Sequence, residues 1–417
     1  MIYRIEVAKK ELSTSDRSIS EISVRAGFND PNYFSKKFKK ATSLFLATVA
    51  LSSALVTSVS AQEQIVIGGN FELSGGAAAY GSVMAKALEL AVELRNAEGD
   101  VLDGYQLATT ILDNKSDLTE SSSVATRLTL VGIIGPATTG ASQAEIPVIT
   151  EAGVPAVLPA ATGDGITLAN DGSVLEYLFR VCFADAYQGT AGASYAFNEL
   201  GAKKVAILSD QATDYSQGLA KAFKEQFEEL GGEIVANESY QSGDADFSAT
   251  LTTLLTQDFD VLYIPGYYTE VGLIIKQARE FGLTQPIVGG DGLASDTLVE
   301  LAGQANVNDV YYTAHFSPNS EEEDVQNFLK AYKEKFGQEA DSFAALSFDA
   351  SNLLIDAIER AGSADRAAVT KAIAETQDFD GVTGTFSIDD QHNPVKPVTM
   401  IKLTAGEIES AEEYSAE

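Results

Sequence analysis

Residues 64–99 read QIVIGGNFELSGGAAAYGSVMAKALELAVELRNAEG, a short apolar run followed by a longer stretch with helical spacing. The short run is apolar without alternation, which is typical of a strand buried on both faces. The longer stretch repeats apolar residues three or four positions apart, as an amphipathic helix does. The predicted apolar side comprises Val83, Ala87, Leu88, Ala91, Val92 and Leu94. Together the two parts predict one strand–helix unit of an α/β fold.

The same order of strand and helix recurs along the rest of the chain. Further candidate strands are residues 105–113, 131–136, 154–160, 204–210, 260–268, 285–292 and 310–316. Helices predicted over 216–232 and 270–283 carry Gly231 and Gly282 at their C-terminal ends, where glycine commonly stops a helix. Mostly continuous apolar strands alternating with helices predict doubly wound parallel sheets with helices on both faces.

Loops that follow the strands are the expected place for a ligand, because doubly wound sheets bind ligands beyond the carboxyl ends of their strands. These loops are residues 70–81, 135–142, 159–165, 209–218, 265–272 and 289–296. They are rich in Gly, Ser, Thr, Tyr and single carboxylates. Such a composition suits hydrogen bonding to a small polar ligand.

Enzyme motifs find no support in these loops. The glycines of residues 68–76 do not make a dinucleotide fingerprint, and residues 140–144 lack the second glycine of a nucleophile elbow. His315 and His392 are too few for a catalytic triad or a zinc site and are predicted to be ordinary strand-end or surface residues. Segments 113–117 and 387–393 lack EF-hand spacing and are predicted turns. We therefore predict no catalytic residue, no metal and no cofactor.

The charge of the chain is unevenly distributed. Lys and Arg total 28 against 60 Asp and Glu, a formal charge of −32. Residues 1–61 carry nine basic and five acidic residues, so the remainder has a net charge of −36. So acidic a body repels phosphate backbones, which excludes nucleic acid as its expected partner. The single cysteine, Cys182, is predicted to be a small core residue.

Residues 36–61 have the three parts of a secretory signal peptide. Four lysines between residues 36 and 40 precede an apolar run over 41–59, which ends with small residues before Gln62. Cleavage after Ala61 would leave Gln62 first and place the protein in the periplasm or outside the cell. The alternative is an uncleaved membrane anchor, although serine and threonine make the run weakly apolar.

Residues 1–40 have a different character. Their segment SISEISVRAGFNDPNYFSKKFKK, residues 18–40, resembles the C-terminal half of the DNA-binding domain of AraC-type transcription regulators. That family uses two helix-turn-helix motifs, and the first is missing here. We interpret the segment as a fragment joined to the signal peptide by a gene fusion or a misjoined reading frame. The alternative is a membrane-tethered DNA-binding regulator.

From residue 64 to about 408 the chain resembles the branched-chain amino-acid-binding family, the extracytoplasmic receptors of ABC importers with the type I periplasmic-binding-protein fold. The motifs that carry the resemblance are FELSGGAAAYG (71–81), DNKSD (113–117), GPATTGAS (135–142), AGVPAVLPAAT (152–162), DYSQGLAKAF (214–223), GYYTEVGLIIKQAREFG (266–282), PIVGGDG (286–292) and FAALSFDA (343–350).

The resemblance implies two α/β lobes joined by three crossovers. Lobe one is expected at 62–180 plus 314–390, and lobe two at 181–313 plus 391–417. It also implies a non-enzymatic receptor that closes over a small amino acid (leucine, isoleucine or valine) and delivers it to an ABC permease in the membrane. The alternative is a related sensor domain for an amide or an aromatic acid.

The resemblance also assigns site residues. The ligand carboxylate is expected at Thr139, beside Thr138, and at Ala160 and Thr162, while Asp291 is expected to face the ligand ammonium. The aromatic residues expected to wall or cover the pocket are Tyr80, Tyr215, Tyr267 and Phe343. The plain alternatives are N-capping for Thr139 and Thr162, a turn-forming role for Asp291, and ordinary core or surface positions for the aromatic residues.

Three departures from the family pattern bear on these assignments. Asp291 replaces the Glu of several members, which shortens its reach to an ammonium group. Thr138 stands where some members have a disulfide cysteine. The join over residues 127–136 is shorter than usual, and we expect it to disturb lobe one near Thr139.

Overall fold

Strand β1 (Glu63–Phe71) forms where the opening apolar run predicts it. The computed structural model describes residues 63–102, 104–128, 130–169 and 171–415. The AraC-like fragment, the signal peptide and its cleavage site lie outside these residues. No helix in the described ranges is both long and apolar enough to cross a lipid bilayer.

The first sheet has five parallel strands in the order β2-β1-β3-β4-β5. Its remaining strands are β2 (Tyr105–Asp113), β3 (Ile133–Ile134), β4 (Ala156–Leu158) and β5 (Leu178–Arg180). Despite the short join before it, β3 pairs with both β1 and β4. The expected disturbance therefore does not break the sheet.

The second sheet has seven strands in the order β14-β13-β10-β9-β8-β6-β7. Its strands are β6 (Lys204–Asp210), β7 (Glu233–Tyr240), β8 (Val261–Tyr263), β9 (Ile287–Gly289), β10 (Val310–Ala314), β13 (Val398–Thr404) and β14 (Glu407–Tyr414). Strands β6 to β10 are parallel, and β13 and β14 add an antiparallel edge. A separate hairpin pairs β11 (Phe379–Gly381) with β12 (Gly384–Phe386).

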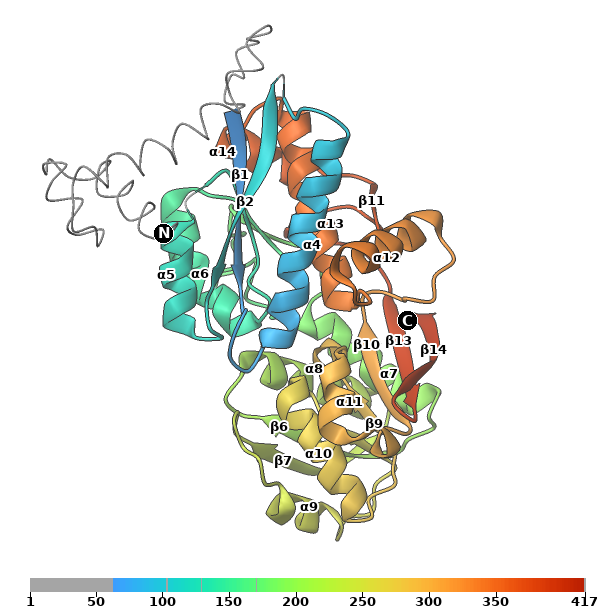
Figure 1. The fold of residues 1–417 in the computed structure, drawn as a ribbon. Coiled ribbons are helices and arrows are strands. Elements are labelled where there is room, and N and C mark those ends of the chain that lie inside the picture. Colours follow the sequence, from blue (N-terminus) through green and yellow to red (C-terminus); the bar gives the residue numbers. More distant parts are fainter. Residues whose placement is uncertain (1–62, 103, 129, 170, 416–417) are drawn as a thin grey trace, which may run out of the picture. The chain divides into compact units, whose positions relative to one another are not determined.

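Helices cover both faces of each sheet, which confirms the α/β fold class (Figure 1). Around the first sheet lie α4 (Ala78–Ala97), α5 (Leu118–Arg127), α6 (Thr139–Ala152), α12 (Glu323–Phe336), α13 (Ser342–Ala361) and α14 (Arg366–Ala374). Around the second lie α7 (Asp185–Asn198), α8 (Asp214–Glu229), α9 (Ser248–Leu254), α10 (Tyr268–Glu280) and α11 (Asp296–Ala302), with the 3-10 turns η1 (Asp291–Leu293) and η2 (Gln304–Asn306).

Successive residues of the central strands pack on opposite faces, as the continuous apolar runs predict. In the first sheet Ile134 and Val157 face α4 and α13, which lie side by side in Figure 1, while Ile133 and Ala156 pack with α5 and α6. Burial on both faces therefore explains why these strands show no polar alternation.

The chain passes between the two sheets three times. Residues 181–184 lead from β5 to α7, residues 315–322 lead from β10 to α12, and residues 387–397 lead from β12 to β13. The predicted lobes, 62–180 plus 314–390 and 181–313 plus 391–417, divide the chain near these three segments. This division into lobes remains a proposal.

The strand and helix predictions hold in outline and fail in detail. Strands β5 and β7 and the hairpins at the C-terminal end were not predicted. Gly231 and Gly282 follow α8 and α10 with φ values of 90° and 89°, as expected of helix-ending glycines. On α4, Ala87, Leu88, Ala91 and Val92 are buried, Val83 is half-buried, and the prediction is wrong for Leu94, which is 39% exposed. Cys182 is fully buried, as predicted.

Candidate functional site

Loops at the carboxyl ends of both sheets enclose a small cavity with about 220 Å³ of empty volume. Its lining residues are Tyr80, Ala137, Thr138, Ala160, Tyr215, Tyr267, Asp291, Gly292 and Phe343. Seven of these were predicted from the sequence, and they come from elements as far apart in the chain as α4, which carries Tyr80, and α13, which carries Phe343.

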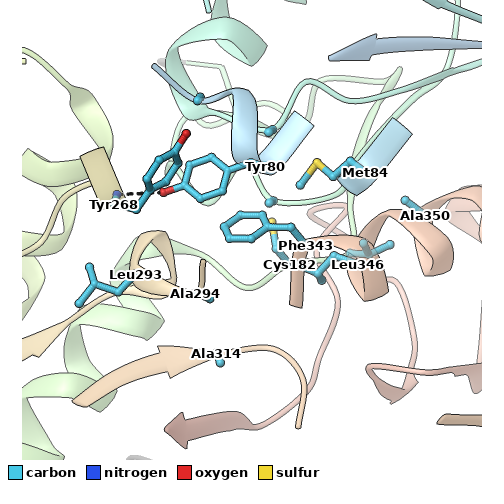
Figure 2. Close-up of a cluster of buried hydrophobic side chains, with 14 of the residues drawn as sticks. Tyr80, Met84, Cys182, Tyr268, Leu293, Ala294, Ala314, Phe343, Leu346 and Ala350 are labelled. Atoms are coloured by element: carbon cyan, nitrogen blue, oxygen red, sulfur yellow. Dashed lines mark hydrogen bonds between the residues drawn. The ribbon is translucent and has the colours of Figure 1, made fainter. Parts of the chain in front are cut away.

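Aromatic rings form one continuous wall of the cavity. Tyr80 stacks on Phe343 with ring centroids 4.2 Å apart, and Tyr215 stacks on Tyr267 at 4.8 Å. The Tyr80 and Tyr267 rings meet edge to face at 5.9 Å and join the two pairs. Figure 2 shows the Tyr80 and Phe343 rings beside each other, with Tyr268 on the far side of Tyr80. Such a wall offers apolar contact to an aliphatic group.

The Tyr80 hydroxyl connects the first turn of α4 to elements of the second sheet. It donates to the Gly292 carbonyl at 2.5 Å and accepts from the Tyr268 N–H at 3.3 Å, the contact drawn in Figure 2. Gly292 belongs to η1 and Tyr268 begins α10. The wall therefore joins elements that pack on different sheets.

Asp291 supplies the acidic group of the cavity. Its Oδ1 accepts from the Tyr215 hydroxyl at 2.8 Å, and its Oδ2 lies 3.1 Å from His315 Nε2. Its backbone N–H donates to Gln188 Oε1 at 2.6 Å. Both carboxylate oxygens thus contact side chains of other elements, so the carboxylate does not act as a turn former.

The two histidines fit the prediction of strand-end or surface residues only in part. His315 does follow β10, but it is buried, and burial lowers its pKa to about 4 although Asp291 opposes the shift. His392 is half-buried, its ring stacks on Phe179 at 4.1 Å, and burial lowers its pKa. Neither is a surface residue, because segments distant in the chain cover both.

Helix α6 begins at the cavity, because its N-cap residue Thr138 lines the cavity. Thr138 is the N-cap residue, but its side chain does not cap the helix; its hydroxyl donates instead to Glu72 at 2.9 Å. Glu72 also accepts from the N–H groups of Ala137 at 3.0 Å and Thr138 at 3.1 Å. Glu72 is fully buried, and burial raises its pKa. This carboxylate fixes the loop that begins the helix.

Thr139 and Thr162 are the two predicted residues that do not line the cavity. Thr139 is buried, and its hydroxyl accepts from the Gly163 N–H at 3.1 Å. Thr162 is buried, and its hydroxyl makes no hydrogen bond of good geometry within the described residues. Neither side chain caps a helix, so the structure does not support the N-capping alternative for them.

Sequence reasoning missed four polar residues around the cavity: Glu72, Asp185, Gln188 and His315. Asp185 begins α7 and is buried beside the Thr162 hydroxyl, but its carboxylate makes no hydrogen bond of good geometry within the described residues. Asp185 and Gln188 follow β5, a strand that the apolar pattern does not predict, so no ligand loop was expected there. Glu72 lies within the first predicted ligand loop, residues 70–81, but had no assigned role.

A model of the periplasmic binding protein family matches residues 64–407. The chain belongs to this family. Its members are solute-binding receptors, and its fold is that of the type I periplasmic binding proteins. The match spans the described part of the chain from β1 to the start of β14.

Individual relatives and solved structures agree with this family. Leu/Ile/Val-binding protein homolog 1 of Brucella abortus (strain 2308) is 32% identical over 352 residues, 84% of this chain and 92% of the relative. The branched-chain amino acid transporter substrate binding protein LivJ of Streptococcus pneumoniae, solved with isoleucine, is 40% identical with a TM-score of 0.80, covering 85% of this chain and 100% of that one. The leucine binding protein LivK of Thermotoga maritima is 34% identical with a TM-score of 0.78, covering 84% and 98%.

Proposed function

We propose that this protein is the extracytoplasmic receptor of an ABC importer, and that it binds leucine, isoleucine or valine and delivers it to a membrane permease. The observation that carries the proposal is a cavity with a carboxylate on one side and the N-terminus of α6 on another, joined by an aromatic wall. An α-amino acid with an aliphatic side chain presents the three complementary groups.

Each part of the ligand has a proposed partner. The ligand carboxylate meets the α6 N-terminus at Thr138 and Thr139, where a helix offers N–H donors and a favourable dipole. Ala160 and Thr162 complete this side. The ammonium group meets Asp291. The aliphatic side chain packs on Tyr80, Tyr215, Tyr267 and Phe343.

Binding and release then require the lobes to move. The cavity lies among residues of both proposed lobes, so a ligand that contacts both favours the closed arrangement. The three segments that pass between the sheets are where a hinge would bend. A permease would receive the ligand from the closed form.

The proposed function is ligand binding and delivery, not catalysis. The cavity is lined by aromatic rings, small residues, one threonine and one carboxylate, a set suited to recognition rather than to a covalent step. The relatives named for leucine, isoleucine and valine point the same way.

A thermal-shift screen of the full chain against all proteinogenic amino acids tests the proposal. Leucine, isoleucine and valine should raise the melting temperature, because a ligand present at a hundred times its Kd stabilises the folded state by about 2.7 kcal/mol. The matched controls are 4-methylpentanoate, which lacks the ammonium, and 3-methylbutylamine, which lacks the carboxylate. Stabilisation by benzoate or acetamide without any by amino acids would favour the sensor alternative and refute the proposal.

A further inference from the structure

Within the described residues, the Asp291 carboxylate has hydrogen-bonding partners in the Tyr215 hydroxyl and the His315 ring. The His315 Nε2 lies 3.1 Å from Asp291 Oδ2, and both side chains are buried. Because a carboxylate only accepts hydrogen bonds, this ring nitrogen carries the hydrogen and donates it. The orientation of Asp291 is therefore set by protein groups before any ligand arrives.

The imidazole of His315 is neutral at ordinary pH, because burial lowers its pKa to about 4 despite the nearby Asp291. The positive charges of Lys396 and Arg180 also lower the pKa of this ring and so oppose its protonation. A neutral donor orients a carboxylate without forming an ion pair with it. A lysine or arginine in this place would instead compete with a ligand ammonium for the same oxygens.

The position of the ring is itself fixed. His315 stacks on Phe183 with centroids 3.6 Å apart and an angle of 26° between the rings. Phe183 lies in the first segment that passes between the two sheets, and His315 begins the second. The donor to Asp291 is thus anchored where two of the linking segments meet.

We propose that His315 is a positioning residue of the ligand site, whose Nε2–H holds the Asp291 carboxylate in the orientation that the ligand ammonium meets. The proposal rests on the function proposed above and extends it to a residue that does not line the cavity. It predicts that the hydrogen-bond donor, rather than the ring, is what ligand affinity requires.

Two substitutions of the full chain separate the donor from the ring. His315→Phe keeps a flat ring to stack on Phe183 but removes the donor, and leucine affinity should fall by roughly ten- to a hundredfold, the usual worth of a hydrogen bond to a charged group. His315→Gln restores an N–H at similar reach and should bind leucine within about fivefold of wild type. Calorimetric titration with leucine, isoleucine and valine measures both.

Tyr195→Phe is the control, because Tyr195 on α7 also packs on aromatic rings, those of Tyr311 and Tyr414, but neither lines the cavity nor lies in a linking segment. It should leave leucine affinity unchanged. Ligand-free melting curves of all variants show how far each change affects folding alone.

The outcomes distinguish the two proposals. If wild type and His315→Phe bind leucine equally well, the proposed role of His315 is wrong. It is also wrong if His315→Gln binds leucine as weakly as His315→Phe. Wild type that binds none of the three amino acids overturns the proposed function and this inference with it.

Discussion

Asp291 shows how the charge of one residue can determine what a small site recognises. Its carboxylate is buried, contacts Tyr215 and His315, and lies on the cavity wall. Both contacts are to groups that donate hydrogen bonds without carrying the positive charge of an ion-pair partner. A bound ammonium would supply that charge.

Asp291→Ala should abolish amino-acid binding while leaving the fold intact. A ligand ammonium left buried without its partner costs about 3–5 kcal/mol. At roughly 1.4 kcal/mol per tenfold, affinity should fall by about two to three and a half orders of magnitude. Calorimetric titration with leucine, isoleucine and valine measures the loss.

Asp296→Ala is the control for this prediction, because Asp296 is an exposed carboxylate at the start of the neighbouring helix α11. It should bind as wild type does. If Asp291→Ala binds within about threefold of wild type, the assignment of Asp291 is wrong.

Asp185 should make stability depend on pH. Burial raises its pKa well above the ordinary value of 3.8, so the folded protein holds this proton at pH values where the unfolded chain has released it. The contribution of the protonated Asp185 carboxyl to the free energy of unfolding is therefore complete below pH 3.8. It is lost as the pH rises through the pKa that Asp185 has in the folded protein. Asp185→Asn, which cannot ionise, should be more stable than wild type at neutral pH by about 1–3 kcal/mol.

Melting curves of the ligand-free protein across pH test this sign. The gain of the Asp185→Asn variant should shrink as the pH falls toward 3.8. Asp164→Asn is the control, since Asp164 is exposed and accepts a bond from the nearby Ala186 N–H. A variant of Asp185 that is less stable than wild type at neutral pH would contradict the argument.

At the scale of elements, the site depends on how closely helix α4 approaches the loop after β1. Gly81 permits this approach: a Cβ added there would lie 2.2 Å from the Glu72 carbonyl oxygen. Glu72 in turn holds the start of α6, and Tyr80 precedes the glycine. One close contact thus places residues on two sides of the cavity.

Gly81→Ala should destabilise the protein by about 1–3 kcal/mol, because α4 must move away from the loop. It should also weaken leucine binding, since Tyr80 and Glu72 move with the two elements. Gly76→Ala is the control, because a Cβ at Gly76 meets nothing within 4 Å. Melting temperature and calorimetric affinity are the measurements, and equal values for the two variants would contradict the prediction.

At the scale of the whole molecule, the net charge of the chain and its predicted signal peptide both fit an exported receptor better than a DNA-binding protein. The chain after residue 61 has a net charge of −36, while the first 61 residues are basic. Acidic surfaces repel phosphate backbones, so the body is unsuited to nucleic acid. A periplasmic or secreted receptor would leave the basic leader behind on export.

We expect the exported protein to begin at Gln62. The basic, apolar and small-residue parts of residues 36–61 place signal-peptidase cleavage after Ala61. Mass spectrometry of the N-terminal peptide, on protein recovered from outside the cytoplasmic membrane, is the measurement. Recovery of peptides beginning at Met1 or Ile2 from that fraction would show the prediction to be wrong.

The sequence by itself determined the kind of fold and most of the cavity. Continuous apolar runs separated by amphipathic stretches specify parallel strands and covering helices, because that pattern depends on local burial alone. Family motifs then identified seven lining residues, including Tyr80, Asp291 and Phe343. Strand β5 was not predicted because Arg180 interrupts its apolar run, and β7 was not predicted because it is an edge strand with a mixed burial pattern.

Only the tertiary structure decided which polar groups meet. His315 lies 24 residues after Asp291, and Glu72 lies 66 residues before Thr138, so no local spacing links either pair. Leu94 shows the same limit on α4: its spacing fits the apolar side, yet its side chain stays 39% exposed. Periodicity records which side of an element is apolar, whereas the partners of a side chain depend on how distant elements pack.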